Sequence, residues 1–288
     1  MKNPRCESPW AHSARTDCVR HARMLKFEPA AQQSASLLRQ RISGVPVDAS
    51  WSKEAHKAAV AKNQPFVLMP CALMANVYCL TVLLHAATHG TVRPLRLLVS
   101  ACLTFVFMDL VSGVLHLILD NPLFLHTPGL KGMCLGFQQH HANPSLIYKM
   151  DLQTHLRPMA APATIVYVVG AGVHGFHSIA FCVGYVCASL CLVWMQLSHR
   201  WAHMPRQRHD AFTRTLITLR VVIQPAQHGL HHLPPYLSNF CILNGLCNPL
   251  LNQALRLPHC SPHSRIWLPA FVGLVLAYIL LSPVVTGL

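Results

Sequence analysis

The chain has 288 residues, of which 52% are hydrophobic and only 11% are charged. Because soluble domains usually carry about 25% charged residues, this composition excludes an ordinary soluble domain and favours several membrane-spanning helices. Basic residues outnumber acidic ones, with 23 Lys and Arg against 9 Asp and Glu. Nucleic-acid-binding domains are not this apolar, so we expect no nucleic-acid partner but basic loops beside anionic lipid headgroups.

The first 65 residues form a polar, basic extension without a long apolar run. We expect a disordered tail there, and its Arg-rich, acid-poor start is also compatible with an organelle transit peptide. Residues 66–288 form the predicted membrane domain.

Apolar runs in this domain predict an all-α polytopic bundle with about four to five membrane segments. A helix needs about 20 apolar residues to cross a bilayer. The run 159–197 is broken near residues 170–177, so it predicts two helices in a tight turn, and the first is short enough to be re-entrant. The candidate segments are 66–87, 97–119, 159–173, 178–197 and 266–285.

Counting crossings places residues 1–65, 120–158 and 198–265 on one side of the membrane. These segments hold 21 of the 23 Lys and Arg residues. The positive-inside rule makes this side cytoplasmic, or stromal in a plastid, so we expect residence in the endoplasmic reticulum or a plastid membrane.

Histidine is the most informative residue type, with 20 in the chain. Eight fall in four short clusters that the crossing count places on the same basic side, where they form a predicted histidine-rich helical cap. Imidazole is the commonest protein ligand for transition metals. Polar side chains within a membrane protein are energetically costly, so a cluster of them indicates a function. Eight imidazoles are too many for one ion and suit two. They are His116, His140, His141, His199, His203, His228, His231 and His232.

The spacing within the clusters supports shared ligation. His199 and His203 are four residues apart, so a helix presents both rings on one face. His228 can face the same way as His231 and His232, which follow it by three and four residues. Neighbouring rings at 140 and 141 point about 100° apart and can address two different metals.

Carboxylates are scarce, because no Glu follows Glu54. A ferritin-like di-iron site built on Glu-x-x-His pairs is therefore excluded, and any metal must be held mainly by histidine. Asp109 shares a helical face with His116, so we expect it to line the bundle interior and to accept a hydrogen bond that fixes a ring.

The metal itself is less constrained, since imidazole suits Zn, Cu, Fe and Ni. A zinc hydrolase needs three protein ligands and usually a carboxylate base. Surplus histidine and scarce carboxylate instead favour two irons that activate O₂, although spacing alone does not identify iron. We expect no catalytic side chain beyond the metal centre.

Four motifs resemble those of the Kua/CarF lipid desaturase family, and together they span about residues 66–252. The fourth is the most specific. The motifs are Asp109-x-x-Ser112-Gly113-x-x-His116 with Asp120-Asn121; Phe137-Gln138-x-His140-His141; His199-Arg200-Trp201-Ala202-His203; and Gln227-His228-x-x-His231-His232-x-x-Pro235-Tyr236-x-x-Asn239-Phe240-Cys241-Ile242-x-x-Gly245-x-x-Asn248.

The resemblance implies an integral membrane, di-iron, O₂-dependent desaturase of phospholipid chains. It implies electrons from cytochrome b5 or ferredoxin. Motif residues Asp120, Gln227 and Asn239 are expected, with Asp109, to support the ligand rings without binding metal themselves. The Phe137-Gln138 pair and the fourth motif look closer to the plastid branch, which places a trans-3 double bond in palmitate of phosphatidylglycerol. That reaction is favoured slightly over vinyl-ether formation in plasmanylethanolamine.

Four alternatives remain at this level. A lipid hydroxylase would use the same centre but return oxygen to the substrate. A histidine-rich metal transporter would carry its ligands along a pore at the membrane midplane, whereas most of these lie in the basic-side segments. A haem-b electron carrier needs histidines on facing spans, where only His116 is well placed. A lipid-binding scaffold with a dead site also fits the sequence.

Overall fold

The computed structural model describes residues 68–91, 93–234 and 236–286, so the predicted extension 1–65 lies outside the described residues. Every regular element in the described part is helical. In chain order they are α4 (Leu68–Thr88), α5 (Pro94–Asp120), η1 (Pro122–Phe124), α6 (Lys131–Ala142), α7 (Ser145–Lys149), α8 (Leu152–Leu156), η2 (Arg157–Met159), α9 (Ala160–His174), α10 (Ile179–His203), η3 (Arg206–Arg208), α11 (Ala211–Thr218), α12 (Pro225–His231), α13 (Asn248–Ala254) and α14 (Trp267–Thr286).

Four helical stretches are long and apolar enough to cross a membrane, which confirms the predicted polytopic bundle. They are α4, α5, the continuous stretch Leu152–His174 and α10. The apolar part of α14 is shorter, over Trp267–Leu281. The re-entrant interpretation of residues 159–173 is corrected, because α8 and η2 lengthen this helix by seven residues at its start. Pro158 opens the η2 turn, where its missing N–H costs nothing.

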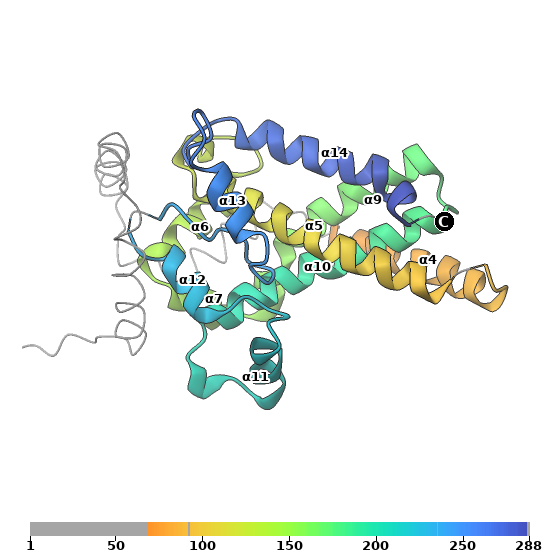
Figure 1. The fold of residues 1–288 in the computed structure, drawn as a ribbon, viewed down its shortest axis with the longest axis horizontal. Coiled ribbons are helices and arrows are strands. Elements are labelled where there is room, and N and C mark those ends of the chain that lie inside the picture. The colour runs from red at the N-terminus through yellow and green to blue at the C-terminus, as the bar shows by residue number, and fades with distance from the viewer. Residues whose placement is uncertain (1–67, 92, 235, 287–288) are drawn as a thin grey trace, which may run out of the picture.

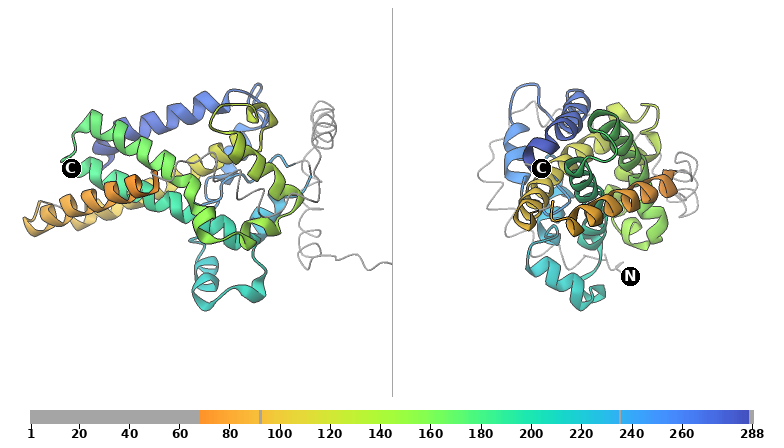
Figure 2. Two further views of the ribbon diagram at one scale, coloured as in Figure 1. Left: turned by 180° about the vertical axis from the view of Figure 1, so that it is seen from behind. Right: turned by 90° about the vertical axis from the view of Figure 1, so that its right-hand side faces the viewer.

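Helix α10 is the centre of the bundle. It packs against α4, α5, α9 and α14, while α5 also packs against α14 and α4 against α9 (Figures 1 and 2). In the most apolar 18-residue stretch of each helix, 72% of the residues of α10 are buried but only 11% of those of α4. The hydrophobic faces that α4 leaves uncovered are therefore placed to meet lipid.

The turn between α9 and α10 follows the sequence prediction. Gly175 ends α9 with a φ of +83°, a conformation that glycine adopts without a steric penalty. The Ser178 hydroxyl then accepts a hydrogen bond from the backbone N–H of Phe181 and caps α10. This turn lies at the end of the bundle near the C-terminus, away from α6, α7 and α12 (Figure 1).

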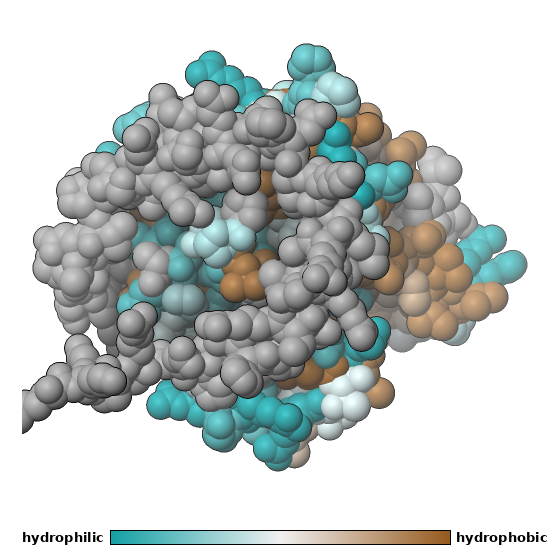
Figure 3. All heavy atoms as spheres, turned by 60° about the vertical axis from the view of Figure 1, so that its left-hand side comes forward, coloured by the Kyte–Doolittle hydropathy of each residue, from teal (hydrophilic) through white to brown (hydrophobic). Residues whose placement is uncertain are grey.

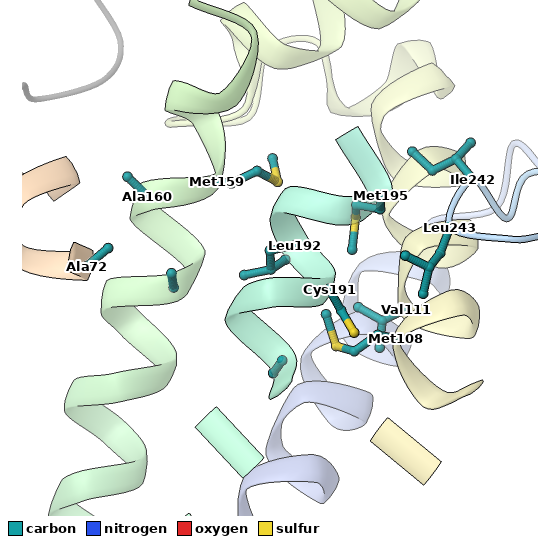
Figure 4. Close-up of a cluster of buried hydrophobic side chains, with 12 residues drawn as sticks. Ala72, Met108, Val111, Met159, Ala160, Cys191, Leu192, Met195, Ile242 and Leu243 are labelled. Atoms are coloured by element: carbon teal, nitrogen blue, oxygen red, sulfur yellow. The ribbon is translucent and has the colours of Figure 1, made fainter. Parts of the chain in front are cut away.

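A hydrophobic core joins the spanning helices to the segment after α12. Met108 and Val111 of α5 meet Leu192 and Met195 of α10, with Leu243 packed against them (Figure 4). On the surface, apolar side chains gather over the spanning helices, and hydrophilic ones cover the α11 segment at the lower edge of Figure 3. The bundle thus has one lipid-facing part and one polar end.

Residues 236–247 are irregular yet largely buried. Irregular backbone inside a membrane protein must find hydrogen-bond partners within the protein. The carboxylate of Asp109 accepts three such hydrogen bonds. One oxygen accepts from the backbone N–H groups of Asn244 and Gly245, both at 3.0 Å, and the other accepts from the backbone N–H of Cys247 at 2.8 Å. The Ser112 hydroxyl accepts from the N–H of Ile242 at 3.0 Å.

Gly113 lets this segment lie directly on α5. A Cβ atom at this position would stand 2.5 Å from the Cys241 sulfur and 2.6 Å from a Leu251 methyl carbon. Gly113 therefore serves close packing of α5 and leaves no space for a lipid chain there.

We predict that Gly113→Ala destabilises the fold by about 1–3 kcal/mol, because the added methyl group overlaps buried neighbours. Thermal unfolding of detergent-solubilised protein measures this as a lower Tm. Gly172→Ala is the matched control, since a Cβ there meets nothing within 4 Å. An unchanged Tm for Gly113→Ala would contradict the close packing of α5 against residues 240–243.

Candidate metal centre

The eight clustered histidines meet at one end of the bundle. His116 lies near the end of α5, His140 and His141 near the end of α6, and His199 and His203 in the last turns of α10; His228 and His231 lie on α12, and His232 directly follows it. His116, His140, His199, His228 and His231 are almost completely buried. Four segments that are distant in sequence therefore place their imidazoles in one place.

The rings divide into two neighbouring groups, in each of which the possible ligand atoms lie within 4.8 Å of one another. The first group contains imidazoles alone, and the second contains three imidazoles around one carboxylate. Ring centroids of His141 and His232, from different groups, are 4.4 Å apart. The first group is His140, His199, His203, His228 and His232; the second is His116, Asp120, His141 and His231.

In the first group, Nε2 atoms approach one another closely. His203 Nε2 lies 3.1 Å from His199 Nε2 and 2.9 Å from His228 Nε2, and His228 and His232 are 3.1 Å apart at the same atoms. An imidazole nitrogen has one in-plane position, for a proton or a lone pair, so one atom makes a poor partner for two neighbours. A shared cation satisfies all of them at once.

The spacing also fits a particular coordination. With metal–nitrogen bonds of ~2.1 Å, adjacent ligands stand ~3.4 Å apart around a tetrahedral ion and ~3.0 Å apart around an octahedral one. The observed 2.9–3.1 Å separations match the octahedral value. Three pairs of donors therefore stand as close together as neighbouring ligands of one transition-metal ion, and all five donor atoms lie within 4.8 Å of one another.

The second group is built around Asp120. One carboxylate oxygen of Asp120 lies 3.3 Å from His116 Nε2, 3.0 Å from His141 Nε2 and 3.1 Å from His231 Nε2. This oxygen and the three nitrogens all lie within 4.8 Å of one another. The geometry thus makes Asp120 a candidate ligand in addition to a residue that supports the rings.

Backbone carbonyls orient three of the rings. His116 Nδ1 lies 2.9 Å from the carbonyl oxygen of Phe240, His231 Nδ1 lies 2.9 Å from that of Ser238, and His140 Nδ1 contacts that of Phe137. A carbonyl oxygen only accepts, so each Nδ1 carries the proton and each Nε2 presents a lone pair toward its group.

Burial keeps three of the rings outside the spanning helices neutral. Burial, reinforced by the neighbouring imidazoles, holds the pKa of His140 and of His228 well below the usual range. The pKa of His231 is also lowered by burial, although Asp120 opposes the shift. At neutral pH these rings therefore offer lone pairs to a metal instead of carrying protons.

The other three polar residues predicted to support the rings hold the irregular segment 236–247 in place instead. Asp109 binds the backbone of residues 244–247, as described above, because it lies deeper in α5 than His116. Gln227 donates to the carbonyl of Gly245 at 3.2 Å. Asn239 pairs with Asn252, whose side-chain amide donates to Asn239 Oδ1 at 3.0 Å. They position the segment that carries the carbonyls of Ser238 and Phe240, so their effect on the rings is indirect.

Sequence reasoning missed these carbonyls because side-chain identity does not mark them. It also missed Arg200, whose guanidinium donates to the carbonyls of Ile147, Tyr148 and Met150 at 2.7–2.9 Å. Arg200 thereby fixes α7 to α10. The available signal was its place between His199 and His203, where a charged side chain on a buried helix needs a partner.

Comparison with known proteins gives the family. Residues 105–257 match the lipid desaturase domain, and this range contains all eight histidines and Asp120. The match covers more than half of the chain. The chain belongs to this family. The family predicted from the four motifs is therefore confirmed, while α4 and α14 lie outside the matched range.

Individual relatives are more distant. The chain is 29% identical over 151 residues to the Arabidopsis thaliana protein named fatty acid desaturase 4, chloroplastic, covering 52% of this chain and 46% of that protein. It is 26% identical over 177 residues to the plasmanylethanolamine desaturase of Myxococcus xanthus, covering 58% of each. The chain thus spans about half the length of the curated relatives it matches. No solved structure matches it.

We predict that His231→Ala lowers the metal content of the purified protein by at least about half, because it removes a buried ligand atom from the second group. Asp120→Ala should do the same if its carboxylate is a ligand. Elemental analysis of purified protein measures both.

His209→Ala is the control. His209 is also buried and lies after α10, but it binds the carbonyl of Trp201 and belongs to neither group. Equal metal content in wild type and in both site variants would contradict a metal site here.

Proposed function

We propose that this protein is an integral membrane lipid desaturase whose two histidine groups hold two iron ions. The observation that carries the proposal is the convergence of four family motifs into two adjacent groups of metal-ligating atoms. The five imidazoles of the first group, without a carboxylate, favour iron over the zinc of a hydrolase, which usually needs a carboxylate base. The chemistry that bound iron supplies is reduction of O₂, which removes two hydrogens from adjacent carbons and yields one double bond and two waters.

The protein's own residues prepare this site in two ways. Carbonyls of Phe137, Ser238 and Phe240 hold three rings in the tautomer whose Nε2 is free to bind metal. The Phe137 and Phe240 rings also pack edge-on against His116, with centroids 5.1 and 5.8 Å away, and shield that side from water. A rigid, largely dry pocket fixes which carbons of a bound chain lie beside the metals.

The substrate we propose is a chain of a membrane phospholipid. The relatives' names point to a fatty acyl chain in one branch and to plasmanylethanolamine in the other. The Phe137-Gln138 pair and the pattern of the fourth motif favour the first, with a trans-3 double bond in palmitate of phosphatidylglycerol. Two electrons and two protons per double bond must come from a separate donor, for which cytochrome b5 and ferredoxin are the candidates.

Lipid analysis of cells that express the chain tests this proposal. We expect a new unsaturated phospholipid in cells with wild-type protein and none with His231→Ala, while His209→Ala keeps the product. A trans-3 acyl chain and a vinyl ether differ in fragmentation and in acid sensitivity, so the same experiment separates the two substrates. A hydroxylated chain would establish the hydroxylase alternative, and unchanged lipids together with bound stoichiometric zinc would contradict the desaturase.

A further inference from the structure

An apolar cavity lies beside the first imidazole group, between α6, α7, the α8–η2 segment and α10. His140 and His199 line it, whereas none of the four residues of the second group does. The cavity therefore leads to one of the two groups only. Most of the other lining residues are glycines or apolar side chains.

One continuous face of α6 forms a long wall of this cavity. The lining residues on the helix follow one another at alternating intervals of one and three, which places them on one side: Gly132, Met133, Gly136, Phe137 and His140. Gly129, which also lines the cavity, precedes the helix and is exposed. Glycine is the least favourable residue in a helix interior after proline. Two glycines one turn apart leave gaps in this wall beside the side chains of Met133 and Phe137.

Hydrogen bonds within the protein hold the opposite wall in place. Ile147 and Met150 line it, and both have carbonyls bound by Arg200. The side-chain N–H of Gln196 donates to the sulfur of Met159, and the backbone carbonyl of Gln196 accepts from Nε2 of His155. Several polar atoms of this wall are thus bonded within the protein, and most of its lining side chains are apolar. Figure 4 shows Met159 directed toward α10.

The shape and charge of the cavity identify the kind of occupant. None of its lining residues is Lys or Arg, so it offers nothing to a phosphate headgroup. The helix rises about 12 Å between Gly132 and His140, which compares with ~15 Å for one leaflet of a ~30 Å hydrocarbon core. An extended hydrocarbon chain fits this description.

We propose that the cavity binds the methyl-terminal part of the lipid chain, with the carbons to be oxidised beside His140 and His199, and that Gly132 and Gly136 set the longest chain accepted. This inference rests on the proposed desaturase function. The headgroup lies on the far side of the histidines from Gly129. The first imidazole group is then the one next to the reacting carbons, and the second group stands behind it.

Chain-length selectivity tests the proposal. Cells expressing each variant are supplied with lauric, myristic, palmitic or stearic acid, and the unsaturated fraction of each chain length is measured. Gly132→Leu should lower the ratio of long-chain to short-chain product at least about tenfold, because a few methylenes no longer fit. Gly132→Ala should move the ratio in the same direction by less, and alanine is the most favourable residue in a helix.

Gly273→Leu is the matched control. It makes the same change in a helix, at a position where a Cβ meets nothing within 4 Å and far from the cavity. Its product profile should equal that of the wild type. If Gly132→Leu and Gly132→Ala retain both activity and the wild-type profile, or shift the position of the double bond without changing the length preference, the proposal is overturned.

A second measurement does not depend on activity. Purified protein is illuminated with a phosphatidylglycerol whose palmitoyl chain carries a diazirine near its methyl end, and the labelled peptides are identified by mass spectrometry. We expect label on residues 129–137, reduced severalfold in Gly132→Leu. Label confined to lipid-facing helices such as α14 would overturn the proposal. If wild type yields no unsaturated lipid but carries label on residues 129–137, the proposed function fails while the binding site stands.

Discussion

The carboxylate of Asp109 holds an irregular stretch of backbone inside a helical bundle. Three N–H groups from residues 244–247 point at it, and the buried segment they belong to has no helix or sheet to satisfy them. An unsatisfied buried N–H costs about 1–3 kcal/mol, so without this anion the segment would be unstable where it lies. Its position in turn sets the carbonyls of Ser238 and Phe240, which orient His231 and His116. The geometry of the histidine centre is therefore held by a residue that does not contact it.

The two groups of ligand atoms differ in charge. The first offers only neutral imidazoles, so an ion there keeps its full positive charge. The second includes Asp120, whose negative charge offsets part of that of an ion and stabilises its higher oxidation state. Two iron ions in these groups would thus have unequal reduction potentials. The cavity opens at the imidazole-only group, so a lipid chain bound there would lie next to the more strongly oxidising of the two ions.

The sequence allowed the spans, the turn at Gly175 and the eight clustered histidines to be predicted, because hydropathy and residue spacing are local properties. It also indicated that all four clusters lie at one end. Spacing could not show how the rings divide into two groups, since that depends on the angles between α5, α6, α10 and α12. For the same reason Asp120 was assigned a supporting role, and Asp109 was expected at a ring when it binds backbone instead. Spacing alone also could not show that Gly132 and Gly136 of α6 line a cavity, because the opposite wall comes from α7, the α8–η2 segment and α10.

The histidines of α12 lie late in the chain, and this order constrains when the centre can form during synthesis. His228, His231 and His232 follow α10 in the chain, and the segment that fixes their orientation follows them in turn. During synthesis the earlier helices enter the membrane with only five of the eight imidazoles available. Both groups stay incomplete until residues up to Cys247 have left the ribosome and docked on α5. Any metal that both groups hold would thus be loaded late in maturation, and a truncated product ending before that point would be released without a finished centre.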